Sequence, residues 1–180
     1  KELKEKGLRV GGFISPEERH HGTRTAFYVM DVESGRQEML ASVDGDGPKV
    51  SKYHVDVKSF ESVAVPAMER ADEYDVFVID EIGRMEMKSA AFVGFLESIL
   101  ESHTPLIATL HEDYVSKYAQ AGELFELTEE SREAVFAMVL RKAREAFEKR
   151  RKIAPEKKPK EAKAPAKKKA EKKPVRKKAA

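Results

Sequence analysis

Two neighbouring acids, Asp80 and Glu81, are the residues of this 180-residue chain whose types and spacing most clearly indicate chemistry. They follow four consecutive apolar residues, Val76 to Ile79, which is the form of a Walker B element: a buried strand with a carboxylate at its end. Asp80 is predicted to hold Mg²⁺, because this small hard cation prefers oxygen ligands. Glu81 is predicted to act as the base that takes a proton from a water molecule attacking a phosphate. The alternative interpretation is that both acids are solvated carboxylates of a turn.

The elements that would position these acids follow from the apolar pattern after residue 75. Residues 75–80 and 105–110 are predicted as buried strands, and residues 89–102 carry apolar side chains at helical spacing. A short helix is predicted over 114–121, a third strand over 124–127, and a last helix from near Thr128. The core stripe predicted for this last helix is Phe136, Val139, Leu140, Ala143 and Phe147.

This alternation of strand and helix predicts a parallel α/β sheet. Ligands of such sheets bind beyond the carboxyl ends of the strands. The candidate site positions are therefore Asp80 with Glu81, residues 109–111, and Thr128.

The N-terminal half is predicted to be richer in strands. A strand is expected over residues 8–14, a charged loop over 17–24, and a β-hairpin from residues 25–32 and 36–43 around the turn Glu33-Ser34-Gly35. A further strand over 53–57 is expected to precede a helix that begins with Ser59 as its cap.

Charge divides the chain into two parts. Residues 151–180 hold 14 Lys and Arg against 3 Glu, a net of +11, whereas the whole chain has a formal net charge of only +2. The segment has too few large apolar side chains to offset the entropy of ordering, so we predict a disordered basic tail that follows a core of residues 1–150. Such a tail is either an arm for nucleic acid or another acidic surface, or a solubilising segment without a defined partner.

A phosphate-cradling loop is missing from the sequence. The string Gly-x-x-x-x-Gly-Lys-[Ser/Thr] does not occur in residues 1–180. The chain begins with Lys rather than Met, and its first residues have the pattern of a helix end that stops at Gly7. We therefore expect that a strand and a phosphate loop lie upstream of Lys1 in the native protein, although a processed protein would look the same.

Several strings together resemble a known family. The run from Asp80 to Glu86 (Asp-Glu-Ile-Gly-Arg-Met-Glu), the run from Gly12 to Ser15, the later Arg19, Gly22 and Arg24, and Ser131-Arg132 look like the thermophile-type nucleoside-triphosphatases. The resemblance covers roughly residues 1–140 and implies a phosphate-loop fold that hydrolyses ATP, GTP or other nucleoside triphosphates with Mg²⁺. In this family the phosphate loop precedes a helix whose end would correspond to the first residues of the chain, so the activity of residues 1–180 alone is in question.

The resemblance implies roles for individual residues. Asp80 would be the magnesium carboxylate and Glu81 the catalytic base, in agreement with the interpretation from the residues themselves. Arg24 and Arg132 would approach phosphate or base, or else form surface ion pairs with glutamates. Thr109 would sense the γ-phosphate, or else be a hydroxyl satisfied by the backbone. Arg84 and Glu86 would touch ligand, or else pair with each other to fix the turn.

The combined prediction is an α/β phosphate-loop hydrolase with a β-hairpin insertion, cytoplasmic by default and without a membrane span. Its partner would be a nucleoside triphosphate. Two alternatives stay open: a nucleotide kinase, against which Glu81 argues because kinases exclude water, and a non-catalytic nucleic-acid-associated module that acts through the basic tail.

Overall fold

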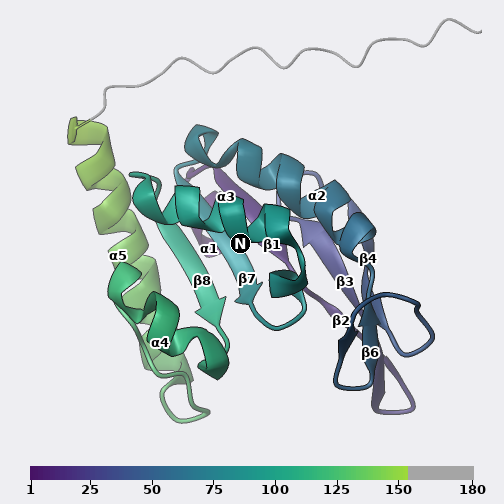
Figure 1. The fold of residues 1–180 in the computed structure, drawn as a ribbon. Helices are drawn as coiled ribbons and strands as arrows, with labels where there is room; N and C mark the ends of the chain where they lie inside the picture. The colour runs from purple at the N-terminus through teal and green to yellow at the C-terminus, as the bar shows by residue number, and fades with distance from the viewer. Residues whose placement is uncertain (154–180) are drawn as a thin grey trace, which may run out of the picture.

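The computed structural model describes residues 1–153, which form a mixed β-sheet with helices on both faces (Figure 1). The spatial order of the strands is β5-β6-β4-β3-β1-β7-β8, and β2 pairs with β3 away from this path. The strands are β1 (Val10–Ile14), β2 (Glu17–His20), β3 (Thr23–Asp31), β4 (Gln37–Ser42), β5 (Lys49–Val50), β6 (Tyr53–Val55), β7 (Val76–Ile82) and β8 (Leu106–Leu110). The longer helices are α2 (Val57–Glu69), α3 (Ala90–Glu101) and α5 (Arg132–Ile153).

The parallel part of the sheet consists of β1, β7 and β8. Val10 lies beside Val76 in the first pair, and Phe77 lies beside Leu106 in the second. The predicted parallel α/β arrangement is therefore confirmed, but its third strand is β1 from the N-terminal half and not residues 124–127. That segment is not a strand, because its leucines are exposed, Leu124 by 54% and Leu127 by 61%, and pairing would have to bury them.

The antiparallel part extends the sheet beyond β1. The predicted hairpin is confirmed as β3 and β4, and its turn contains Gly35 at φ +71°, a backbone conformation that L side chains rarely adopt. The prediction that residues 17–24 form a loop is wrong for most of the segment, because β2 pairs there with β3. The predicted strand over 53–57 ends at Val55, because Asp56 caps the helix that follows.

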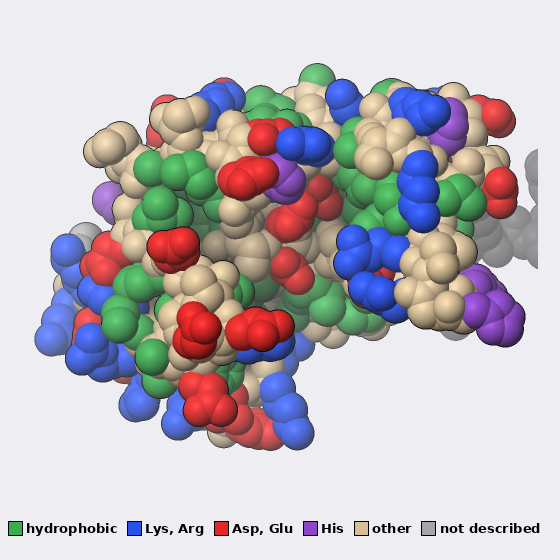
Figure 2. Space-filling view, turned by 90° about the horizontal axis from the view of Figure 1, so that it is seen from below, with side chains coloured by type: hydrophobic (Ala, Val, Ile, Leu, Met, Phe, Trp, Pro, Cys, Tyr) green, Lys and Arg blue, Asp and Glu red, His purple; other side chains and the backbone are tan. Residues whose placement is uncertain are grey.

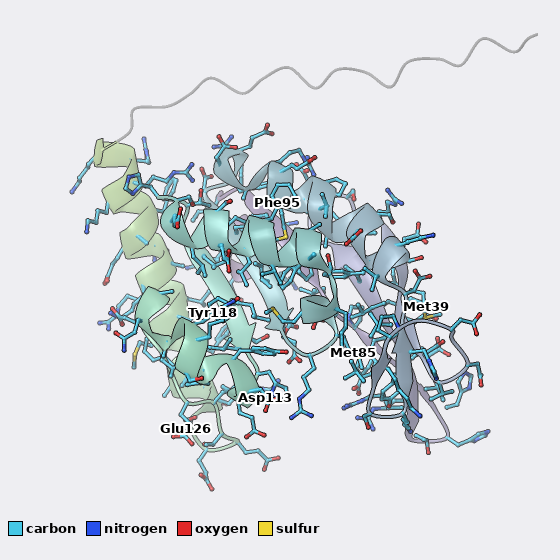
Figure 3. All side chains as sticks on the ribbon, viewed as in Figure 1. Met39, Met85, Phe95, Asp113, Tyr118 and Glu126 are labelled. Atoms are coloured by element: carbon cyan, nitrogen blue, oxygen red, sulfur yellow. The ribbon has the colours of Figure 1, made fainter. Side chains whose placement is uncertain are left out.

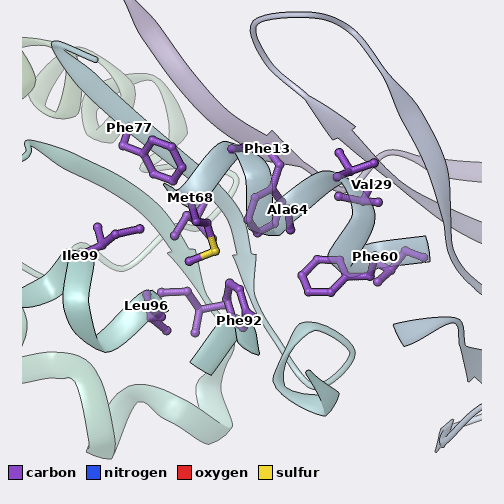
Figure 4. Packing of buried hydrophobic residues seen from close by; sticks show 14 of the residues in the cluster. Phe13, Val29, Phe60, Ala64, Met68, Phe77, Phe92, Leu96 and Ile99 are labelled. Atoms are coloured by element: carbon purple, nitrogen blue, oxygen red, sulfur yellow. The ribbon is translucent and has the colours of Figure 1, made fainter. Parts of the chain in front are cut away.

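One face of the sheet is covered by α2 and α3, which together enclose the main core (Figure 4). Three fully buried rings, Phe13 of β1, Phe60 of α2 and Phe92 of α3, meet edge to face with centroid distances of 5.6, 6.0 and 5.7 Å. The cap of α2 is Asp56, whose side chain accepts a hydrogen bond from the amide of Ser59, so the prediction of Ser59 as cap is wrong. The helix predicted over 89–102 is confirmed as α3.

The other face carries the short α1 (Glu2–Glu5) and α5, as Figure 1 shows. A second cluster joins Leu3 of α1 to Val10, Val76 and Ala143 of α5. The last helix begins at Arg132 rather than near Thr128, and the predicted core position Phe136 is wrong because its side chain is 55% exposed. No helix among residues 1–153 has the length and apolar character to cross a membrane.

Short elements lie between the longer ones: one between α2 and β7, one between β7 and α3, and three between β8 and α5. They are the 3₁₀ turns η1 (Ala71–Glu73), η2 (Glu86–Lys88), η3 (Glu112–Tyr114) and η4 (Ala119–Ala121), and the helix α4 (Val115–Tyr118). The helix predicted over 114–121 is thus divided between α4 and its flanking 3₁₀ turns. Since α5 continues to Ile153, the helix extends past the boundary predicted at residue 150, and the rest of the predicted tail, residues 154–180, lies outside the described residues.

Candidate active site

Asp80 and Glu81 lie where β7 approaches its carboxyl end, and both are half-buried. Successive side chains of a regular strand point to opposite faces of a sheet. Here the pairing with β8 is irregular: Ile79 lies beside Ala108 but Ile82 lies beside Leu110, so β7 has one residue more than its neighbour between these pairs. Such a bulge changes the direction of the side chains it contains. It places the two carboxylates in different environments.

Asp80 is held by the neighbouring strand. The hydroxyl of Thr109 donates a hydrogen bond to Asp80 Oδ1 over 2.6 Å. The structure therefore brings two of the predicted site residues together across β7 and β8. The hydroxyl of Thr109 bonds a carboxylate and not the backbone, which removes the alternative of an ordinary backbone-satisfied hydroxyl.

Glu81 is the last residue but one of β7, directly before Ile82 and the turn at Gly83. A Cβ atom added to Gly83 would lie 2.2 Å from Glu81 Oε1 and 2.8 Å from Glu86 Oε2. The carboxyl groups of both glutamates thus lie against the Cα atom of the same glycine, and the absence of a side chain there makes room for them. Steric crowding by these two carboxyl groups therefore explains why a glycine occupies position 83.

Glu86 is the buried acid of the site, with 2% of its surface exposed. Its Oε1 accepts a hydrogen bond from the hydroxyl of Ser15, 3.2 Å away at the end of β1. Burial raises the pKa of Glu86 to about 7, and the nearby charges of Glu81 and Asp80 act in the same direction, against hydrogen bonds from its own backbone amide and from Ser15. Three carboxyl groups therefore share a small region at the carboxyl ends of β1 and β7.

An ion pair between Arg84 and Asp113 joins the turn after β7 to η3. The guanidinium of Arg84 lowers the pKa of the Asp113 carboxyl, and Asp113 in turn raises the pKa of Arg84. Asp113 lies at the end of the sheet where β7 and β8 finish (Figure 3). The predicted alternative of an ion pair between Arg84 and Glu86 is wrong, because Arg84 pairs with Asp113 and Glu86 bonds Ser15.

Figure 2 looks onto this end of the molecule, and acidic side chains gather near the middle of the face with basic side chains on both sides of them. Arg24, on β3, is exposed, pairs with Glu17 and lies 5.4 Å from the ring centroid of Phe27. Arg132, the exposed first residue of α5, forms no hydrogen bond or ion pair with a residue of the described part. Neither arginine contacts Asp80 or Glu81, and for Arg24 the contacts are those of a surface ion pair.

The donor set of the site suits Mg²⁺. No group of three or more His, Cys, Asp or Glu side chains within residues 1–153 could hold a metal on its own. Mg²⁺ does not need such a cage, because it binds one or two carboxylates together with water and substrate phosphates. Asp80, fixed by Thr109 at the strand end, could supply the hard oxygen ligand that this mode of binding uses.

The strand β8 lies at the edge of the described sheet. It pairs with β7 on one side, and its residues Ala108 and Thr109 are exposed, although parallel strands are ordinarily covered on both faces. A groove of about 270 Å³ runs beside it, with Leu106, Leu110 and Tyr118 among its lining residues. The edge of β8 thus offers unpaired backbone groups and apolar surface next to Asp80.

Sequence reasoning did not assign roles to Ser15 and Gly83 and left Glu86 undecided. Ser15 and Glu86 are 71 positions apart, so no local spacing relates them. The only available signals were the position of Ser15 at the end of a strand and the small Gly83 between two acids.

The chain is similar to known nucleoside-triphosphatases. A family model described as NTPase matches residues 1–140. The nucleoside-triphosphatase THEP1 of Methanocaldococcus jannaschii is 42% identical over 142 residues, which are 78% of this chain and 83% of the relative. The protein of the same name from Pyrococcus abyssi is 40% identical over 147 residues, 81% of this chain and 82% of the relative.

Two solved structures have a similar fold. The crystal structure of THEP1 from Aquifex aeolicus superposes with a TM-score of 0.68 at 28% identity, and it matches 78% of this chain and 87% of the other. The solution structure of a human cancer-related nucleoside triphosphatase gives a TM-score of 0.66 at 29% identity, over 79% of this chain and 86% of the other. With a family model that spans more than three quarters of its length, the chain belongs to the NTPase family.

Proposed function

We propose that this chain is the catalytic core of a nucleoside-triphosphatase that hydrolyses nucleoside triphosphates to diphosphate and phosphate with Mg²⁺. Membership of the NTPase family and the names of the relatives support the reaction. The observation that carries the proposal is the pair of carboxylates at the end of β7, with Asp80 fixed by Thr109 and Glu81 held against Gly83.

The residues divide the work by position. Asp80 would hold Mg²⁺, which when bound would neutralise charge on the phosphates. Glu81 would orient the attacking water and accept its proton, since the hydroxyl of Thr109 bonds the carboxylate of Asp80. Thr109 would keep Asp80 in place and would sense the terminal phosphate. Catalysis of this kind consists of positioning and electrostatic stabilisation, without a covalent intermediate.

Hydrolysis by this core requires a phosphate-binding loop, which residues 1–180 do not contain. We propose that the loop is carried on a strand that pairs in parallel with the edge of β8. The exposed Ala108 and Thr109 and the adjoining groove support this placement. It would put the loop next to Asp80, since the carboxyl ends of neighbouring parallel strands meet at one edge of a sheet.

The proposal is tested by measuring phosphate release by the full-length gene product. This product comprises residues 1–180 and any further residues that the gene encodes. The protein should release inorganic phosphate from ATP and GTP in the presence of Mg²⁺, without any acceptor nucleotide. Chelation of the metal should stop the release. Release that requires a second nucleotide as acceptor would instead identify a nucleotide kinase, and no release with an intact fold would overturn the proposal.

We also propose a cytoplasmic location for the protein and a nucleic-acid partner for its basic segment, residues 151–180. The partner is supported by the net charge of +11 in residues 151–180 alone. Binding of RNA that persists after deletion of residues 154–180 would contradict it.

A further inference from the structure

Glu86 is an unusual residue for its place in the fold. Glutamate is almost never fully buried unless it is paired with a cation, yet Glu86 is 2% exposed and no residue of the described part forms an ion pair with it. Its side-chain partner is the hydroxyl of Ser15, at 3.2 Å. Burial of a carboxyl group costs free energy that burial of an apolar side chain would not. Its presence here therefore indicates that the carboxyl group itself is needed.

The turn does not need this carboxyl group in order to close. Its backbone is held by hydrogen bonds from the amide of Met87 to the carbonyl of Gly83 and from the amide of Lys88 to the carbonyl of Met85, both 3.1 Å long. The ion pair of Arg84 with Asp113 ties it to the loop after β8. An apolar side chain would fill the space of Glu86 at lower cost, so a purely structural role does not explain an acid there.

The position of the carboxyl group relates it to Glu81. Glu81 Oε1 and Glu86 Oε2 lie 2.2 and 2.8 Å from the point that a Cβ atom of Gly83 would occupy. The other oxygen of Glu86 is bonded to Ser15 at the end of β1. Glu86 therefore joins the neighbouring strand to the region directly beside the carboxylate of Glu81.

We propose that Glu86 is a positioning residue for the hydrolytic reaction: anchored by Ser15, its carboxyl group supports the Glu81 carboxylate across Gly83 and keeps it directed at the attacking water. This inference rests on the proposed function. The pKa of Glu86, raised to about 7, agrees with this role, because a substantial fraction of these carboxyl groups is then neutral near pH 7 and a neutral carboxyl group can lie beside Glu81 without repelling it.

The test compares two replacements of Glu86 in the full-length gene product. Glu86→Gln keeps the length and hydrogen-bonding capacity of a neutral carboxyl group, whereas Glu86→Met keeps the length and volume but removes the hydrogen bonds. We expect kcat of Glu86→Gln to stay within about threefold of the wild type, and kcat of Glu86→Met to fall about tenfold or more with KM within about threefold. Ser15→Ala, which removes the anchor, should lower kcat in the same direction and should add little to Glu86→Met in the double variant.

A second serine–glutamate pair of the same fold provides the control. Ser89, the N-cap of α3, donates from its hydroxyl to Glu61 Oε1 on α2 over 2.6 Å. Glu61→Met should leave kcat unchanged, which separates loss of a part-buried serine–glutamate hydrogen bond from loss of positioning.

Unchanged kcat in both Glu86→Met and Ser15→Ala would overturn the inference. An equal fall of kcat in Glu86→Gln and Glu86→Met would also overturn it, and so would a rise in the KM of Glu86→Met at constant kcat. If Glu86→Met fails to fold, as judged by its circular dichroism, the Ser15→Ala and Glu86→Gln results still decide. Failure of the proposed function is recognised separately, because the wild type itself would then release no phosphate.

Discussion

Replacement of Gly83 by alanine should lower the turnover of the full-length gene product without disturbing its fold. The new Cβ atom would lie 2.2 Å from Glu81 Oε1, whereas an ordinary contact is 3.4 Å or more, so the carboxylate must move by about 1 Å. The backbone at Gly83 is not in the left-handed region, and the three crowded atoms all belong to the carboxyl groups of Glu81 and Glu86, so the clash is relieved by side chains and not by the backbone.

The size of the effect follows from this displacement. A misplacement of about 1 Å at a reacting group costs about 100-fold in rate, which corresponds to about 2.7 kcal/mol in the activation free energy. The assay is steady-state phosphate release with saturating nucleotide and Mg²⁺, together with a thermal melt of each variant. We expect kcat of Gly83→Ala to fall about 100-fold while the melting temperature stays close to that of the wild type.

Gly94 provides a matched control. It lies inside α3, and a Cβ atom added there would meet nothing within 4 Å. Gly94→Ala should therefore leave kcat unchanged and raise the stability by about 0.5–1 kcal/mol, because alanine is the better helix former. If Gly83→Ala keeps kcat within a factor of about two, the close placement of Glu81 against Gly83 is not needed for hydrolysis and the reasoning is refuted.

Three further predictions concern Thr109, Glu86 and the cap of α2. Thr109→Val removes the hydroxyl that holds Asp80. We expect the Mg²⁺ concentration for half-maximal activity to rise about fivefold, because the binding free energy of the metal falls by about 1 kcal/mol. An unchanged metal titration would show that the bond does not position Asp80. Because the pKa of Glu86 is raised to about 7 in the fold from an ordinary 4.5, the unfolded chain releases this proton first as the pH rises. The wild type should therefore lose about 3 kcal/mol of stability between pH 4.5 and a pH above 7, and Glu86→Gln should not; parallel curves in urea denaturation without Mg²⁺ would contradict this. Asp56→Ala removes the cap of α2 and should cost about 1 kcal/mol in the same denaturation assay without a change in kcat.

The sequence allowed the prediction of those features that leave a local pattern. Four apolar residues followed by Asp80 and Glu81 identify a strand and its end, and the strand that ends at Thr109 could be predicted in the same way. The pairing of these two strands then brings Thr109 to Asp80, as the rule for parallel sheets implies.

Features that depend on distant or competing residues could not be predicted. The bond between Ser15 and Glu86 exists only because β1 lies beside β7, and the sequence contains no signal for that neighbour relation. Residues 124–127 have a β-prone composition, but propensity is a weak guide where leucines are left exposed. At the start of α2, Asp56 and Ser59 are both good caps, and only the backbone geometry selects Asp56.

The replacement Glu81→Gln in the full-length gene product tests the central claim most directly, by measurement of nucleotide affinity and turnover on the same sample. Glutamine keeps the size of Glu81 but cannot accept the proton of the attacking water. We predict that the affinity for nucleoside triphosphate with Mg²⁺ stays within about threefold and that kcat falls about 100- to 1000-fold, the contribution expected of a general base. Turnover equal to that of the wild type, at unchanged affinity, would show that Glu81 is not the base and would contradict the account.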